Sequence, residues 1–260
     1  MIGIFDSGVG GMTVARAIEE LLPESPILYL GDIARSPYGS KSARTIIEYS
    51  LENTRFLVEN GAEVIVVACN SAASVASEHL RREFSLPIVD VIAPAVNEAL
   101  RVSRTGRIGV IGTRATIQSG LYERELTGKN RQCRVFSQAC PLLVPLVEEG
   151  WLDRRETKMI LRRYLFALKN RQIDTLVLGC THYPLLSRLI QPRIGKRVRL
   201  IDSSLATASS LRQELAGHPA ILPQTGHRPA DNRYHVTDLT ESARQIAARI
   251  FGRPIELILI

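Results

Sequence analysis

Two cysteines, Cys69 and Cys180, are the residues of this chain best placed for chemistry. Each follows a short apolar run typical of a buried strand, and each precedes small polar residues. Residues 63–71 resemble residues 174–182, so the two thiols occupy equivalent positions in the two segments. Cysteine often fills protein cores, but a role in core packing does not explain why a cysteine follows the equivalent strand in both repeated segments. We therefore expect both thiols to act in the function.

The arrangement of these thiols limits the reactions that they could catalyse. A disulfide oxidoreductase usually carries its cysteines as C-x-x-C, a spacing that none of the 4 cysteines shows. A nucleophilic hydrolase needs one cysteine with a base beside it. Two equivalent groups that face a substrate from opposite sides suit racemisation, in which one thiolate removes a Cα proton and the other thiol protonates the opposite face.

Racemisation also needs groups that favour a thiolate and stabilise a carbanionic transition state. His182 is a candidate partner for Cys180, and Asp6 is a candidate partner for Cys69. The histidines outside this segment have no such neighbours and are interpreted as structural; they are His79, His218, His227 and His235.

Residues 6–11 read DSGVGG, a glycine-rich strand-to-helix turn whose N–H groups could hold an anion. Thr13 stands where a dinucleotide fingerprint needs glycine, and the turn lacks the Gly-Lys-Ser/Thr ending of a Walker A loop. A carboxylate is the anion that we expect, with a purely structural turn as the alternative. Residues 36–39 form a second turn, in which Tyr38 either binds a ligand or holds the loop.

Short apolar runs alternate with helix-like stretches along the chain. Strands are expected at residues 3–5, 27–30, 64–67 and 88–91, and the spacing of apolar residues predicts a helix over 43–59. This alternation predicts an α/β fold with parallel sheets covered by helices.

The same order of segments occurs twice. Residues 2–7 resemble 108–113 and residues 89–90 resemble 201–202, which with the cysteine segments makes an internal duplication. We expect two pseudo-symmetric lobes with the active site in the cleft between them, because ligands bind at the carboxyl ends of parallel strands.

The C-terminal tail is expected to complete the first lobe. The tail reads as a helix over 205–215, a strand at 234–236, a helix over 238–251 whose capping box ends at Glu241, and a strand at 255–260. The predicted lobes are residues 1–93 plus 206–260 and residues 94–205.

The composition fits a globular enzyme. The 260 residues are enough for a core without disulfides or metals, and no apolar run approaches the ~18 residues of a membrane span. The net charge of +7 favours anionic partners, but scattered basic residues and 5% aromatics do not suggest a nucleic-acid platform. No cysteine has metal-site spacing, and no signal peptide is visible, so we expect reduced thiols and a cytoplasmic protein.

Five sequence blocks carry a family resemblance that covers essentially the whole chain. They are GIFDSGVGG at 3–11, GD at 31–32, PYG at 37–39, ACN at 68–70 and GCTHYP at 179–184. In this order they resemble the glutamate racemase family, and the last block is the most specific. One departure is Ser71, where the family often has threonine; the hydroxyl is kept and a methyl is lost, which implies slightly looser positioning.

The resemblance implies a two-base isomerase that interconverts L- and D-glutamate without a cofactor or metal and supplies D-glutamate for peptidoglycan. It further implies two α/β lobes and a homodimer, with no requirement for nucleic acid or membrane. The implied acid/base pair is Cys69 and Cys180, assisted by Asp6, His182 and Glu148. The implied substrate contacts are Asp6, Ser7, Tyr38, Gly39, Asn70, Ser71, Thr113, Thr116, Thr181 and His182.

Three alternatives make different predictions. A single-cysteine hydrolase or transferase that uses Cys180 and His182 would not need Cys69, and its covalent intermediate could be trapped. A non-catalytic protein that binds anions or nucleic acid would show salt-dependent DNA affinity and no turnover. A racemase for aspartate or another amino acid would be recognised with a substrate panel.

Overall fold

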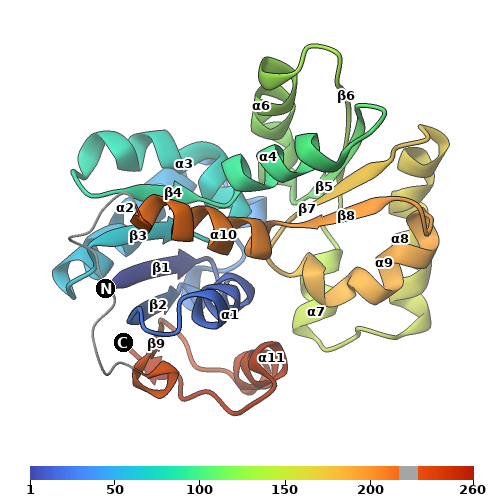
Figure 1. The fold of residues 1–260 in the computed structure, drawn as a ribbon. Coiled ribbons are helices and arrows are strands. Elements are labelled where there is room, and N and C mark those ends of the chain that lie inside the picture. Colours follow the sequence, from blue (N-terminus) through green and yellow to red (C-terminus); the bar gives the residue numbers. More distant parts are fainter. Residues whose placement is uncertain (217–227) are drawn as a thin grey trace.

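A computed structural model gives the structure, and it describes residues 1–216 and 228–260. The fold is α/β with two parallel sheets (Figure 1). Across the first sheet, the strands are β10 (Ile258–Leu259), β9 (Arg233–Val236), β2 (Ile27–Gly31), β1 (Ile2–Asp6), β3 (Val64–Val67) and β4 (Ile88–Asp90). Across the second sheet, they are β6 (Arg134–Ala139), β5 (Arg107–Gly112), β7 (Thr175–Gly179) and β8 (Arg199–Asp202).

The two sheets repeat one topology. The order β2-β1-β3-β4 in the first sheet matches the order β6-β5-β7-β8 in the second. The strand register repeats as well: Ile2 pairs with Val64 in the first sheet, and its counterpart Ile108 pairs with Thr175 in the second. The two α/β lobes with an internal duplication are therefore present in the backbone, as the sequence predicts.

Helices cover both faces of each sheet (Figure 1). In the first lobe, α1 packs with α10 and α11, and α2 packs with α3; in the second, α8 packs with α9, and α4 packs with α6. The helices are α1 (Met12–Leu21), α2 (Ala43–Glu59), α3 (Asn70–Glu83), α4 (Ile92–Val102), α5 (Arg114–Gln118), α6 (Leu121–Lys129), α7 (Leu143–Glu148), α8 (Arg155–Asn170), α9 (Ser187–Ile194), α10 (Ser203–Ala216) and α11 (Glu241–Phe251). The predicted helix over 43–59 is confirmed as α2.

The C-terminal tail returns to the first sheet, where β9 pairs with β2 and β10 pairs with β9. Two expectations for this tail are wrong: α11 begins at Glu241 and not at Asp238, and the last strand covers only Ile258–Leu259. The hydroxyl of Thr240 accepts the N–H of Ala243 at 3.1 Å, so Thr240 is the N-cap and no capping box ends at Glu241. His218 and His227 lie outside the described residues.

The apolar core extends through both lobes. One cluster of buried side chains fills the first lobe and continues to Val110 and Val177 of the second sheet, and another lies under α7, α8 and α9. Among the residues that the structure describes, no helix is long and apolar enough to cross a membrane.

Close packing at Gly3 in β1 gives a test of this core. A Cβ added there would lie 2.6 Å from Cβ of Ala62, an atom that cannot rotate away. We expect Gly3→Ala to lower the free energy of unfolding by about 1–3 kcal/mol. Gly128, inside α6, is the matched control, because a Cβ there meets nothing within 4 Å.

Gly128→Ala should raise the free energy of unfolding slightly, by no more than about 0.5–1 kcal/mol, since glycine is a poor helix former and Gly128 lies in the last turn of α6. Urea denaturation of both variants beside the unsubstituted protein measures the two effects. Equal stabilities of the three proteins would contradict the packing described for β1.

Candidate active site

Cys69 and Cys180 lie just beyond the ends of the equivalent strands β3 and β7. Cys69 is the N-cap residue of α3, and Cys180 precedes a short 3₁₀ turn at Tyr183–Leu186. Both side chains are buried, with 4% and 5% of their surface exposed. The duplicated topology therefore brings the two thiols to corresponding places at the boundary between the lobes.

A histidine and a carboxylate accompany Cys180. The ring Nδ1 of His182 lies 3.9 Å from Cys180 Sγ, and Nε2 lies 3.3 Å from Oε1 of Glu148, the last residue of α7. Burial alone would lower the pKa of His182, but its contacts with Cys180 and Glu148 and their negative charge raise the pKa to about 10. The ring is therefore a cation at neutral pH, and a cation beside a cysteine favours a thiolate.

A different environment surrounds Cys69. Burial raises the pKa of Cys69 to about 12, and the negative charge of Asp6 adds to the effect. Its Sγ lies 3.5 Å from the hydroxyl oxygen of Ser7, and backbone N–H groups of Ser7 and Ala72 also point at it. Cys69 is therefore a neutral thiol at physiological pH, with donors in place that would stabilise its anion.

The glycine-rich turn after β1 holds a carboxylate of its own chain. The N–H of Gly8 donates to Oδ2 of Asp6 at 3.0 Å, and the N–H of Gly11 also donates to this carboxyl group. Burial raises the pKa of Asp6, whereas the charge of His182 and these hydrogen bonds lower it. These two N–H groups of the expected anion-binding turn are thus used by Asp6.

The same turn packs directly on the residues that follow Cys180. A Cβ on Gly10 would lie 2.5 Å from the ring of His182 and 2.5 Å from Oγ1 of Thr181, so no larger residue fits. Thr181 also donates to Asp6 Oδ1 at 3.4 Å. Residues predicted for opposite halves of the site therefore touch across the lobe boundary.

A row of hydroxyl groups forms a second link between the lobes. Ser71 Oγ lies 2.9 Å from Oγ1 of Thr113, which lies 3.0 Å from Oγ1 of Thr116. Gly39 packs against this row, because a Cβ there would lie 2.5 Å from Cβ of Thr113. All three hydroxyl residues are buried, and such groups can hydrogen-bond a carboxylate.

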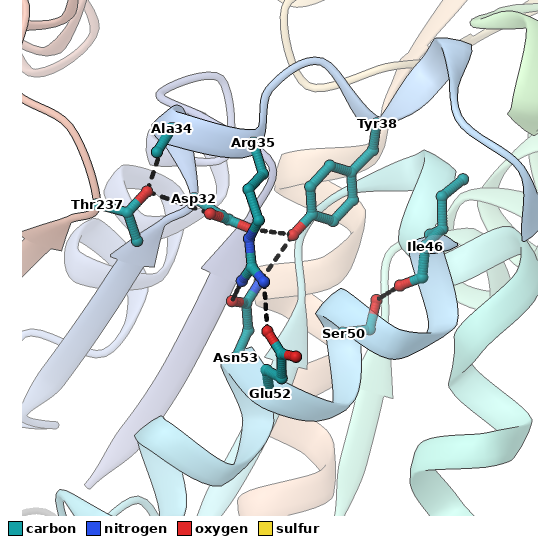
Figure 2. Close-up of polar contacts among 9 residues, drawn as sticks. All are labelled: Asp32, Ala34, Arg35, Tyr38, Ile46, Ser50, Glu52, Asn53 and Thr237. Carbon is teal, nitrogen blue, oxygen red and sulfur yellow. Dashed lines mark hydrogen bonds and ion pairs between the residues drawn. The ribbon is translucent and has the colours of Figure 1, made fainter. Parts of the chain in front are cut away.

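The side chain of Tyr38 points into a largely buried polar network (Figure 2). Its hydroxyl donates to Asp32 and accepts from Asn53 Nδ2 at 3.0 Å. Asp32 also binds Arg35 Nε at 2.7 Å and the hydroxyl of Thr237 at 3.1 Å. The hydroxyl of Tyr38 is thus occupied in holding its turn.

The sequence analysis did not single out Asn53, Arg35 or Thr237, which hold this turn. Asn53 lies on α2, and Thr237 follows β9, so neither stands near Tyr38 in the chain. The only feature of the sequence that could have indicated Thr237 is its position directly after a short strand, which the predicted site residues share. That this strand, β9, lies beside β2 is known only from the order of strands in the sheet.

A hollow of about 370 Å³ opens next to the site, with Gly8, Pro37 and Glu148 in its lining. Ser242 of α11 also lines it and donates a hydrogen bond to the carbonyl of Glu148. The C-terminal tail therefore contributes to the rim beside Glu148. Within residues 1–216 and 228–260, no three His, Cys, Asp or Glu side chains are grouped so that they could hold a metal ion.

Comparisons with known proteins give a consistent result over the whole chain. Residues 11–211 match the family model of Asp/Glu/Hydantoin racemases. A glutamate racemase of Aquifex aeolicus is 47% identical over 255 residues, which are 98% of this chain and 95% of that protein. A glutamate racemase of Geobacter metallireducens is 44% identical over 251 residues, 96% of this chain and 92% of that protein.

A solved structure agrees with these relatives. The crystal structure of glutamate racemase from Francisella tularensis in complex with D-glutamate is similar with a TM-score of 0.92 and 32% identity. The similarity covers 100% of this chain and 96% of that one.

The ion pair of His182 predicts an unusual titration. We expect His182 to keep its proton up to about pH 10, against 6.5 for an ordinary histidine. Glu148→Gln should lower the pKa of His182, because it removes the carboxylate beside Nε2 that helps to raise this pKa. Side-chain NMR titration measures this, with His235, whose pKa is lowered by burial and by Arg233, as the internal control.

The raised pKa of His182 also makes the free energy of unfolding depend on pH. Because the pKa is raised in the fold, the folded chain keeps a proton that the unfolded chain loses between pH 6.5 and about 10. This contribution to the free energy of unfolding is complete below pH 6.5 and declines as the pH rises through that window. Titration of His182 near pH 6.5 would contradict the ion pair.

Proposed function

The chain belongs to the Asp/Glu/Hydantoin racemase family and is an amino-acid racemase, and we propose that it interconverts L- and D-glutamate by proton transfer between Cα and the two thiols Cys69 and Cys180. The observation that carries this mechanism is the placement of both thiols at equivalent strand ends of two duplicated lobes. The relatives named glutamate racemase, one of them solved with D-glutamate, support the choice of substrate.

In the proposed reaction, each thiol serves one face of the substrate. The thiolate of one cysteine takes the Cα proton of one enantiomer, so that a C–H bond breaks and an S–H bond forms. The other thiol then gives its proton to the opposite face of the carbanion, and this cysteine becomes the thiolate. The reverse reaction uses the same two groups with their roles exchanged.

The two thiols have different electrostatic surroundings. The His182 cation lies 3.9 Å from Cys180 Sγ, where it would stabilise a thiolate formed during the reaction, whereas Cys69 keeps its proton because burial raises its pKa to about 12. When the reaction makes Cys69 the thiolate, the N–H groups of Ser7 and Ala72 stabilise it. Asp6 and His182 thus act as the partners of the two thiols.

The buried polar groups around the thiols suit a dicarboxylic substrate. We assign the substrate contacts to Asp6, Ser7, the backbone of Tyr38 and Gly39, Asn70, Ser71, Thr113, Thr116, Thr181 and His182. Hydroxyl and amide donors in a water-poor site stabilise the negative charge that develops next to the substrate carboxylate as the Cα proton leaves. Proton transfer by these side chains requires no cofactor.

Four further features complete the proposal. D-Glutamate is supplied to peptidoglycan synthesis, the active form is a homodimer, and the lobes comprise residues 1–93 plus 206–260 and residues 94–205. The enzyme acts in the cytoplasm, where a reducing environment keeps its free cysteines as thiols.

Solvent deuterium tests the reaction directly. Purified protein is incubated with L-glutamate in deuterium oxide, with a chelator and without pyridoxal phosphate, and optical activity and deuterium at Cα are followed together. Loss of optical activity with one deuterium at Cα is expected. Absence of change with both L- and D-glutamate under reducing conditions would refute the substrate assignment, and activity on aspartate alone would indicate a different racemase.

Serine substitutions test the two-base mechanism. Cys69→Ser and Cys180→Ser should each lower kcat at least about 100-fold, because a hydroxyl is a far poorer acid and base near neutral pH than a thiol. Cys133→Ser is the control, since Cys133 lies next to the amino end of β6, away from the strand ends that carry the site. A Cys69→Ser variant with the unsubstituted rate would instead favour a single-cysteine mechanism.

A further inference from the structure

Tyr122, the second residue of α6, connects the two strand ends that carry the thiols. Its hydroxyl donates to Oδ1 of Asn70 at 2.7 Å. Its ring lies against Gly179, where an added Cβ would be 3.2 Å from the ring Cε2 atom. Asn70 directly follows Cys69, and Gly179 directly precedes Cys180. One side chain therefore touches the neighbour of each thiol, across the boundary between the lobes.

The hydrogen bond from Tyr122 fixes the orientation of the Asn70 amide. Tyr122 and Asn70 are each only 2% exposed, so the bond is shielded from water. Burial raises the pKa of the Tyr122 hydroxyl well above its usual value of 10, and the charges of Asp90 and Cys180 add to this. The hydroxyl consequently remains a donor, and Oδ1 of Asn70 remains its acceptor.

The other end of the amide has no such partner. Nδ2 of Asn70 is buried and makes no hydrogen bond within the described part of the chain. A buried donor without an acceptor is costly, and this one belongs to a residue beside the reacting thiol. A carboxylate oxygen of a substrate is the acceptor that this donor suits.

We propose that Tyr122 is a positioning residue, which holds the Asn70 amide so that Nδ2 donates to a substrate carboxylate. This inference rests on the proposed function and adds a residue that does not itself touch the substrate. Without the hydroxyl, the amide can turn over and present Oδ1, which repels a carboxylate. The ring contact with Gly179 keeps this amide aligned with the Cys180 strand end.

Tyr122→Phe tests the proposal, because it removes the hydroxyl and keeps the ring. We expect KM to rise about five- to tenfold, the loss that corresponds to one hydrogen bond, with kcat changed less than about threefold. The ratio kcat/KM must fall by the same factor in both directions, since the equilibrium constant between two enantiomers is one. Initial rates with L- and D-glutamate measure this.

A double-mutant cycle separates positioning from a general loss of stability. Asn70→Ala should raise KM by itself, and adding Tyr122→Phe to it should raise KM no further. Tyr234→Phe is the matched control, because Tyr234 is also buried and its hydroxyl donates to Glu19 at 2.9 Å in the first lobe. This control should lower the melting temperature and leave both KM values unchanged.

Each other outcome has a distinct meaning. An unchanged KM in Tyr122→Phe, a loss confined to kcat, or independent effects in the cycle would overturn the positioning role. Absence of turnover by the unsubstituted protein would overturn the proposed function and this inference with it. Should Tyr122→Phe fail to fold, NMR of the unsubstituted protein decides, since the Nδ2 protons of Asn70 must shift when D-glutamate binds; unchanged signals overturn the proposal.

Discussion

The candidate site depends on the interactions of one buried cation, the ring of His182, with the groups around it. Its ring lies between Cys180 and Glu148, and its charge also acts on Asp6, which is fully buried. Without this cation, Cys180, Glu148 and Asp6 would lie close together in a poorly hydrated site with no positive charge among them, which would destabilise the fold. Gly10 leaves room for the His182 ring, because a side chain at that position would displace it.

Duplication gives the thiols equivalent backbone positions, but their partners have diverged. In the matching segments, the counterpart of Asp6 is Gly112, and the counterpart of His182 is Ser71. One thiol therefore has a carboxyl group as its neighbour and the other has an imidazolium. The proposed two-base mechanism uses one thiol and one thiolate in turn, and this asymmetry gives the two thiols of a nearly symmetric scaffold different surroundings.

The lobes are joined by contacts among residues of the candidate site and their neighbours. Ser71 bonds to Thr113, Thr13 donates to the carbonyl of Thr181 at 3.3 Å, and Tyr122 bonds to Asn70. The C-terminal tail takes part as well, since Thr237 binds Asp32 and Ser242 binds the carbonyl of Glu148. Folding of the tail onto the first sheet is therefore coupled to the geometry around the thiols.

The sequence by itself determined the strands at 3–5, 27–30, 64–67 and 88–91, the helix over 43–59, the duplication and the equivalence of Cys69 and Cys180, because apolar periodicity and repeated motifs are local properties. It did not reveal the edge strand β6. It left open where the Tyr38 hydroxyl binds and did not show that Asp6 takes the N–H groups of Gly8 and Gly11. Only the tertiary structure decided these points and the place of Thr237, which meets Asp32 across a separation of 205 positions. Such contacts depend on the order of strands in a sheet, here β9 beside β2, and no local pattern encodes that order.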